Sequence, residues 1–221
     1  MLDKLNITAI LKSFSLVSFA NIIKLVISFV CIKLIAIMLG PSGVALIGQL
    51  NNFVAMIMSF SGGGIMTGIT KYVAENRDSE ERSKDYISTA FRITIYFSLT
   101  IGLLLVLLHD FISRKVLLSP DYGPVFILFG STLFLYALNT MILCLLNGYQ
   151  ELRKYVIVNL SGSSIGLFLT LLLIFPFGLI GAMISIVTTQ SITFFVSCWM
   201  IRNYPWMSWS YFSGKFNILV L

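Results

Sequence analysis

Long apolar runs recur along most of this chain and constrain its fold more than any other feature. The six runs cover about 14–39, 43–68, 86–108, 124–147, 155–175 and 178–201. Each is long enough for a helix to cross a bilayer, which takes roughly 20 apolar residues, and none alternates with the period of two that a strand would show. Charged residues make up 11% of the chain, against about 25% in a typical soluble domain. The sequence therefore predicts an all-α polytopic membrane protein.

Short turns with glycine and proline separate the runs in two places. The segments LGPSG (39–43) and FPFG (175–178) each predict a tight connection and hence an antiparallel helical hairpin. A charged segment, residues 71–85, joins the second and third runs, and we interpret it as a soluble helical extension or loop. The N-terminus lacks the short apolar core and small-residue cleavage site of a signal peptide, so we expect the first run to remain a permanent helix.

The end of the chain differs from the rest. We assign residues 1–205 to one N-terminal six-helix transmembrane lobe. Residues 206–221 contain aromatic side chains suited to a segment at the membrane interface, and they end in FNILVL, which resembles the opening of a truncated seventh span. We therefore expect the chain to be the first half of a longer protein.

Lysine and arginine are distributed unevenly between the two sides of the predicted membrane. One side has Arg114 and Lys115. The other has ten: Lys4, Lys12, Lys71, Arg77, Arg82, Lys84, Arg153, Lys154, Arg202 and Lys215. Because cytoplasmic loops carry the excess of positive charge, this pattern predicts that both ends of the chain face the cytoplasm. The net charge of +6 then reflects topology and contact with anionic membrane lipids, and nothing in it points to nucleic acid.

Three cations remain inside the predicted spans: Lys24, Lys33 and Arg92. The acidic residues all lie in loops or at span ends, so no counter-ion is embedded with these cations. Placing lysine or arginine at mid-bilayer costs roughly 2.5–3.5 kcal/mol, and such residues usually face a wet cavity or the interior of a bundle.

Helical phase separates the two lysines. They are nine residues apart, which at about 100° per residue places them on opposite sides of one helix. Lys24 lies on a short polar stripe with Asn21 and Ser28, so a cavity-lining position is favoured over bonding to backbone carbonyls within the bundle. Lys33 has apolar neighbours on its own face, and snorkelling or helix–helix bonding is favoured over a ligand role. Arg92 is interpreted either as an anchor at the inner interface or as a guard at the cytoplasmic mouth of a cavity.

Polar residues in the other spans suggest a hydrophilic groove lined by several helices. Each residue alone is more typical of interhelical hydrogen bonding than of a ligand site. The candidates include Gln49 and Asn52 in the second run, Tyr136, Asn139 and Asn147 in the fourth, Asn159 in the fifth, and Gln190, Thr193 and Ser197 in the sixth. The small-residue motif GSSIG (162–166) is interpreted as a close-packing element. The three cysteines lie in different spans, with no spacing typical of a metal site or disulfide.

Three segments carry a resemblance to a known family: the first run with its two lysines, LGPSGVALIGQLNNF (39–53) and GGGIMTGITKYVAE (62–75). They resemble the N-terminal half of bacterial lipid-linked oligosaccharide flippases, the Wzx-type translocases of O-antigen and enterobacterial common antigen. These flippases belong to the multidrug/oligosaccharidyl-lipid/polysaccharide exporter superfamily. LNGYQELRKYVIVNLSGSSIG (146–166) is similar to the passage between the family's fourth and fifth spans.

The resemblance implies a twelve-helix protein of two six-helix lobes around a cationic cavity, in the bacterial inner membrane. It would move undecaprenyl-pyrophosphate-linked glycans from the inner to the outer leaflet by alternating access. Lysine and arginine suit the pyrophosphate, whereas asparagine, glutamine and serine suit sugar hydroxyls. The expected substrate-binding residues are Lys24, Asn21, Arg92, Lys33, Asn52, Gln49 and Asn139. No cofactor is expected; polysaccharide polymerase and other assembly proteins come into consideration as partners.

Three alternatives stay open. A cation- or proton-coupled multidrug antiporter of the same superfamily would need an aspartate or glutamate inside its membrane spans, and the predicted spans of this chain have none. A membrane enzyme would need a base or a metal site, and the single histidine, His109, lies beside Asp110 at a span end. A membrane scaffold would leave the embedded cations unexplained. We therefore expect a transporter and not an enzyme.

Overall fold

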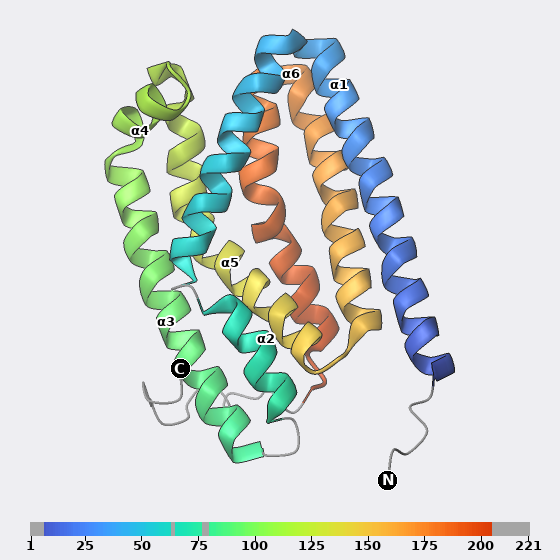
Figure 1. The fold of residues 1–221 in the computed structure, drawn as a ribbon. Helices are drawn as coiled ribbons and strands as arrows, with labels where there is room; N and C mark the ends of the chain where they lie inside the picture. Colours follow the sequence, from blue (N-terminus) through green and yellow to red (C-terminus); the bar gives the residue numbers. More distant parts are fainter. Residues whose placement is uncertain (1–6, 63–64, 77–79, 205–221) are drawn as a thin grey trace.

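The computed structural model describes residues 7–62, 65–76 and 80–204 and shows a bundle of helices (Figure 1). In chain order the elements are α1 (Ile7–Ser61), α2 (Met66–Glu75), α3 (Glu80–Leu107), α4 (His109–Val116), the short 3-10 helix η1 (Pro120–Tyr122), α5 (Gly123–Gly148) and α6 (Leu152–Ile201). Within these ranges, four helices are long and apolar enough to cross a membrane: α1, α3, α5 and α6. The expected segment 206–221 lies outside the described residues.

Two of these helices are hairpins that turn at a glycine. Gly40 has φ 69° and ψ −176°, and Gly178 has φ 54° and ψ −128°. A methyl group on either glycine would meet no atom within 4 Å, so the backbone conformation, rather than a lack of space, requires glycine. Each hairpin therefore has a first and a second leg, before and after its glycine. With α3 and α5, the four legs make the six membrane-length helices of one lobe, which confirms the predicted fold class.

The second apolar run ends earlier than its sequence suggested. The second leg of α1 stops at Ser61 rather than near residue 68, because a run of glycines follows, and glycine is a poor helix former. The separate helix α2 comes next and is not a free soluble extension. Its Ile69 and Val73 are buried, and Thr70 donates a hydrogen bond to the carbonyl of Cys144 in α5 at 3.3 Å.

Helix α5 is the centre of the lobe and contacts α2, α3, α4 and α6. Two buried clusters lie along it. The first surrounds Phe126, Phe129 and Leu133 and includes residues from both hairpins. The second surrounds Met141 and Leu145 and includes residues from α2, α3 and the end of α6. Because α5 is fixed at both ends, it provides a stable wall for anything built between the hairpins.

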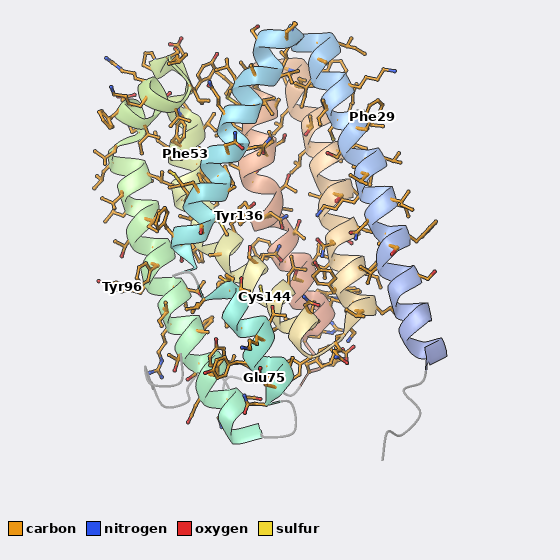
Figure 2. The ribbon with its side chains drawn as sticks, in the orientation of Figure 1. Phe29, Phe53, Glu75, Tyr96, Tyr136 and Cys144 are labelled. Carbon is orange, nitrogen blue, oxygen red and sulfur yellow. The ribbon has the colours of Figure 1, made fainter. Side chains whose placement is uncertain are left out.

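The outer surface of the lobe is apolar. Phe29 on α1 is 68% exposed and Tyr96 on α3 is 70% exposed, and the two side chains project from opposite sides of the bundle (Figure 2). Exposed apolar surface on this scale is unfavourable in water but suits contact with lipid. The chain is thus a multi-pass membrane protein.

Lysine and arginine residues are more numerous at one end of the bundle than at the other. Lys71, Lys84, Arg153, Lys154 and Arg202 lie at the end where α2 is found. At the other end, the short helix α4 has Asp110 in its first turn and Arg114 and Lys115 in its last turn (Figure 1). This arrangement follows the helix dipole within α4. The described loop lysines and arginines thus cluster at the end of the bundle where α2 lies, as the sequence pattern predicted.

Candidate functional site

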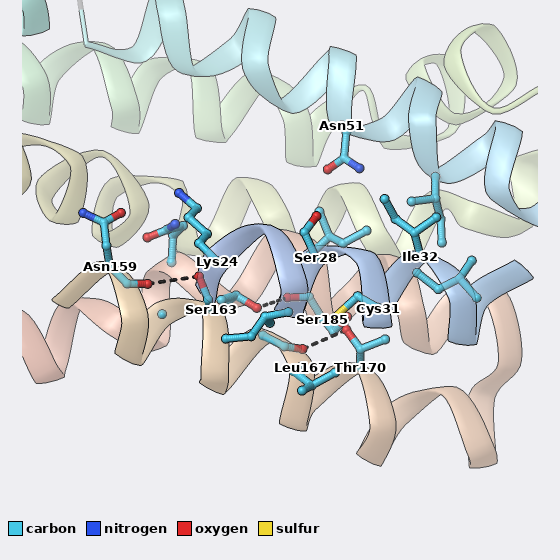
Figure 3. Close-up of a pocket in the computed structure, with 18 of the residues that line it drawn as sticks. Lys24, Ser28, Cys31, Ile32, Asn51, Asn159, Ser163, Leu167, Thr170 and Ser185 are labelled. Atoms are coloured by element: carbon cyan, nitrogen blue, oxygen red, sulfur yellow. Dashed lines mark hydrogen bonds between the residues drawn. The ribbon is translucent and has the colours of Figure 1, made fainter. Parts of the chain in front are cut away.

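A cavity of about 370 Å³, lined by both polar and apolar side chains, lies between the two hairpins. Its walls are the first leg of α1, the second leg of α1 and both legs of α6, and Tyr136 of α5 closes one side. Figure 3 shows Lys24 and Ser28 on one leg of α1, with Asn51 reaching toward them from the other leg. The two legs of the α1 hairpin therefore lie against α6, and the cavity lies between α1 and α6.

The first leg of α1 presents one helical stripe to the cavity. The lining residues of this leg are Lys24, Ile27, Ser28, Cys31, Ile32 and Ile35, which recur at intervals of three and one, as one face of a helix requires. Lys33 lies off this stripe, as the phase argument predicted; it is exposed, as are Lys24 and Ser28 on the stripe itself. Asn21, which sequence reasoning placed on the polar stripe, is also exposed and does not line the cavity.

The second leg of α1 contributes Asn51 to the cavity lining, whereas the neighbouring Asn52 does not line the cavity. Sequence reasoning selected Gln49 and Asn52, but both are exposed on other faces of the leg. The signal that identifies Asn51 is the apolar row Ile47, Leu50, Val54 and Ile57, whose members are all buried. Asn51 lies four residues after Ile47 and so borders the inward face of the helix.

The floor of the cavity is formed by α6 and is rich in hydroxyl groups. Ser163 donates to the carbonyl of Asn159 at 3.1 Å, and Thr189 donates to the carbonyl of Ser185 at 2.5 Å. Thr170 donates to the carbonyl of Gly166 at 2.8 Å. A hydroxyl has one proton, so Ser163 and Thr189 have used their donor and keep lone pairs that can accept hydrogen bonds from a ligand. Thr170 is buried, and its hydroxyl also hydrogen-bonds with Ser185 Oγ at 2.8 Å. Asn159 and Gln190 were expected in a hydrophilic groove, and both line the cavity. The hydroxyl groups of Thr170 and Thr189 were not singled out, because serine and threonine are common along α6.

The GSSIG motif holds the two legs of α6 together beneath the cavity. A methyl group at Gly162 would lie 3.2 Å from Thr193 Oγ1, and one at Gly166 would lie 3.2 Å from Thr189 Cγ2. The legs approach this closely because the motif offers no side chain at the contact. The interpretation of GSSIG as a packing element is confirmed, and the same contact sets the depth of the cavity.

Lys24 is the one charged side chain among the described residues that line the cavity, and no aspartate or glutamate accompanies it there. Figure 3 shows its amine on the same side of the cavity as the amide of Asn159. A lysine that faces polar groups and no acid can bind an anion, since its charge is not already neutralised by the protein. The cavity thus combines one cation, several amides and a floor of acceptor hydroxyls.

Asn139 lies behind the cavity wall rather than on it. Its side chain is fully buried, donates to Gln190 Oε1 at 2.7 Å and accepts from Ser197 Oγ at 2.5 Å. Gln190 itself lines the cavity. Asn139 can therefore affect the cavity only through Gln190, because its own side chain is buried and does not reach the cavity surface.

Arg92 and His109 lie away from the cavity. Arg92 is exposed on α3, beside a shallow surface hollow that also includes Tyr96, Leu99 and Leu103. His109 Nδ1 lies 3.1 Å from Asp110 Oδ1 at the start of α4, at the end of the bundle where α1 and α6 turn. The structure thus brings Lys24 and Gln190 to one site and leaves Lys33, Arg92, Gln49 and Asn52 outside it.

The arrangement of helices matches solved transporters. The chain superposes with a TM-score of 0.70 and 15% identity on a transporter of the MOP superfamily from Pyrococcus furiosus, covering 94% of this chain and 47% of that one. It matches equally well, at a TM-score of 0.70 and 16% identity, a multidrug resistance transporter of the MATE family in an outward-facing conformation, covering 92% of this chain and 47% of that one. At these identities the likeness shows the fold alone, which corresponds to about half of each of the two solved structures.

The sequence comparison gives the family. Residues 10–220 match the family described as "Polysaccharide biosynthesis protein", and the chain belongs to that family. It is 27% identical over 134 residues to proteins named "Lipid III flippase" from Escherichia coli (strain K12) and Shigella flexneri. The match covers 61% of this chain and 32% of each relative, so the chain spans about a third of the length of these curated relatives. The curated relatives are named as flippases, and the solved structures are described as transporters.

Proposed function

We propose that the protein to which this lobe belongs is a flippase for lipid-linked oligosaccharides. It translocates an undecaprenyl-pyrophosphate-linked glycan from the inner to the outer leaflet of the bacterial inner membrane, for surface polysaccharide of the O-antigen type. Membership of the polysaccharide biosynthesis family and similarity to the lipid III flippases support this proposal. The observation that carries it is the cavity in which Lys24 has no acidic neighbour.

The chemistry of the cavity fits the two parts of such a headgroup. Pyrophosphate oxygens only accept hydrogen bonds at neutral pH, and Lys24 offers three N–H donors and a positive charge. Sugar hydroxyls donate as well as accept, and the hydroxyl oxygens of Ser163 and Thr189 can accept from them. In this proposal the pyrophosphate binds at Lys24 and the glycan lies along α6. Lys33 and Arg92 serve as contacts to membrane lipid.

Reconstitution distinguishes this function from multidrug antiport. Proteoliposomes should contain the product of the complete reading frame, together with an undecaprenyl-pyrophosphate-linked oligosaccharide labelled on its sugar with a fluorophore that dithionite can quench. We expect the inner-leaflet pool to become quenchable faster than in protein-free liposomes, and ethidium uptake to stay at background under a proton or sodium gradient. Gradient-driven ethidium uptake without lipid exchange would contradict the flippase proposal and would instead indicate a multidrug antiporter.

The proposed orientation places both ends of the chain in the cytoplasm. Arg114 and Arg153 are both exposed and lie at opposite ends of the bundle. In intact spheroplasts, a membrane-impermeant maleimide should label Arg114→Cys, and should label Arg153→Cys only after the membrane is permeabilised. The reverse labelling pattern would invert the topology.

A further inference from the structure

Behind the cavity, three polar side chains form a row of hydrogen bonds with one direction. Ser197 Oγ donates to Asn139 Oδ1 at 2.5 Å, and Asn139 Nδ2 donates to Gln190 Oε1 at 2.7 Å. Ser197 and Asn139 are fully buried, whereas Gln190 lines the cavity. The row therefore starts on the second leg of α6, crosses to α5, and returns to α6 at the cavity wall.

The serine hydroxyl sets the direction. It lies closer to Asn139 Oδ1, at 2.5 Å, than to the carbonyl oxygen of Thr193, at 3.1 Å, so its proton is directed to the amide. Asn139 then has its carbonyl oxygen occupied by Ser197 and offers an N–H to Gln190. Gln190 has its own carbonyl oxygen held by Asn139, and its two N–H donors remain for the cavity.

We propose that Ser197 and Asn139 are positioning residues that hold Gln190 as a hydrogen-bond donor toward the cavity. Together with Lys24, Gln190 then forms a subsite for the phosphate oxygens of the ligand, and this inference rests on the proposed function. A reversed amide would turn a carbonyl oxygen toward an anion and would repel it. The short contact with Ser197 disfavours that alternative, because a rotated Asn139 would place its amide nitrogen, instead of its oxygen, 2.5 Å from Ser197 Oγ, which is closer than the usual range of about 2.7–3.2 Å for an N–H···O hydrogen bond.

Equilibrium binding tests the relay. The probe is geranylgeranyl pyrophosphate, titrated by calorimetry into the detergent-purified product of the complete reading frame at fixed ionic strength. Ser197→Ala should weaken binding about tenfold, the effect of losing one hydrogen bond to a charged group, and Ser197→Thr should restore it by retaining the hydroxyl. Gln190→Leu should weaken binding by a similar factor. Adding Ser197→Ala to Gln190→Leu should cause no further loss, because Ser197 acts through Gln190.

Ser191→Ala is the matched control. Ser191 lies on the same leg of α6, is 3% exposed, and donates to the carbonyl of Thr132 in α5 at 3.0 Å, but it does not line the cavity. Its removal costs one buried bond between the same two helices and should change binding by less than about twofold. Equal effects of Ser191→Ala and Ser197→Ala, or additive losses in the double variant, would overturn the relay.

The failure of the relay can be told apart from the failure of the proposed function. If the wild-type protein binds the pyrophosphate and Lys24→Ala weakens it while Ser197→Ala does not, the relay alone is wrong. If the wild-type protein shows no binding of the pyrophosphate, both the relay and the flippase proposal are contradicted.

Discussion

Replacing Lys24 with alanine is expected to reduce glycan translocation to near the protein-free rate, a loss of at least about tenfold. Lys24 is the one charged side chain among the described cavity residues, so its removal leaves the pyrophosphate without a partner of opposite charge. Lys24→Arg retains the charge and should keep part of the activity, reduced because a planar guanidinium differs in shape from an ammonium group. The measurement is the initial rate of lipid exchange in proteoliposomes with matched protein content.

Lys33 provides the control for this experiment within the same helix leg. It is the same residue type, nine positions further along, and it is exposed as Lys24 is, but it lies outside the cavity. Lys33→Gln should therefore leave the exchange rate close to that of the wild type. Equal activity of Lys24→Ala, Lys24→Arg and the wild type would remove Lys24 from the mechanism, and a complete loss in Lys33→Gln would reverse the ranking of the two lysines.

A larger side chain at Gly130 is expected to cause a large loss of stability. Helices α3 and α5 touch through their backbones here: a methyl group at Gly130 would lie 2.5 Å from the carbonyl oxygen of Gly102, and the reverse contact is equally short. Gly130→Val must push the helices apart, and overpacking of this kind costs about 3 kcal/mol. Thermal unfolding of the purified protein in detergent, followed by circular dichroism, measures the effect.

Gly48→Val is the matched substitution at an open position. Gly48 is exposed, and a methyl group there would meet no atom within 4 Å. We expect a change in unfolding free energy of less than about 1 kcal/mol, since valine and glycine differ little in helix propensity compared with the cost of a clash. If Gly130→Val were as mild as Gly48→Val, the close contact between α3 and α5 would not be required for the fold.

Much of the architecture follows from the sequence because a bilayer permits few solutions. Apolar runs of spanning length must be helices, and the glycines at 40 and 178 show where the chain reverses. The second run was predicted to end near residue 68, but the helix ends at Ser61. The glycines that follow Ser61 lie within a hydrophobic stretch, so the hydropathy pattern alone did not show that the helix stops there. The packing of α2 against α5 was also missed, because the charged residues near it suggested a solvated segment.

The site was harder to predict, because its geometry depends on how separate helices face one another. Lys24 could be placed from phase within one helix. The same phase argument favoured snorkelling or helix–helix bonding for Lys33, but Lys33 was still expected among the substrate-binding residues and lies outside the cavity. Gln49 and Asn52 were chosen for their polarity, whereas the inward face is marked by the buried row that Asn51 borders. Asn139 was recognised as polar, but its role behind Gln190 depends on a contact 51 residues away in the chain. No pattern along a single helix records such a contact.

The central claim is that the cavity recognises a lipid-linked pyrophosphate, and the dependence of exchange on headgroup charge tests it most directly. The same fluorescent oligosaccharide should be attached to undecaprenol either through pyrophosphate or through a neutral glycosidic bond, and both lipids compared in identical proteoliposomes. We expect the pyrophosphate-linked glycan to exchange at least about tenfold faster than in protein-free liposomes, and the neutral lipid to exchange at the protein-free rate. Equal protein-dependent exchange of the two lipids, or none of either, would contradict the account.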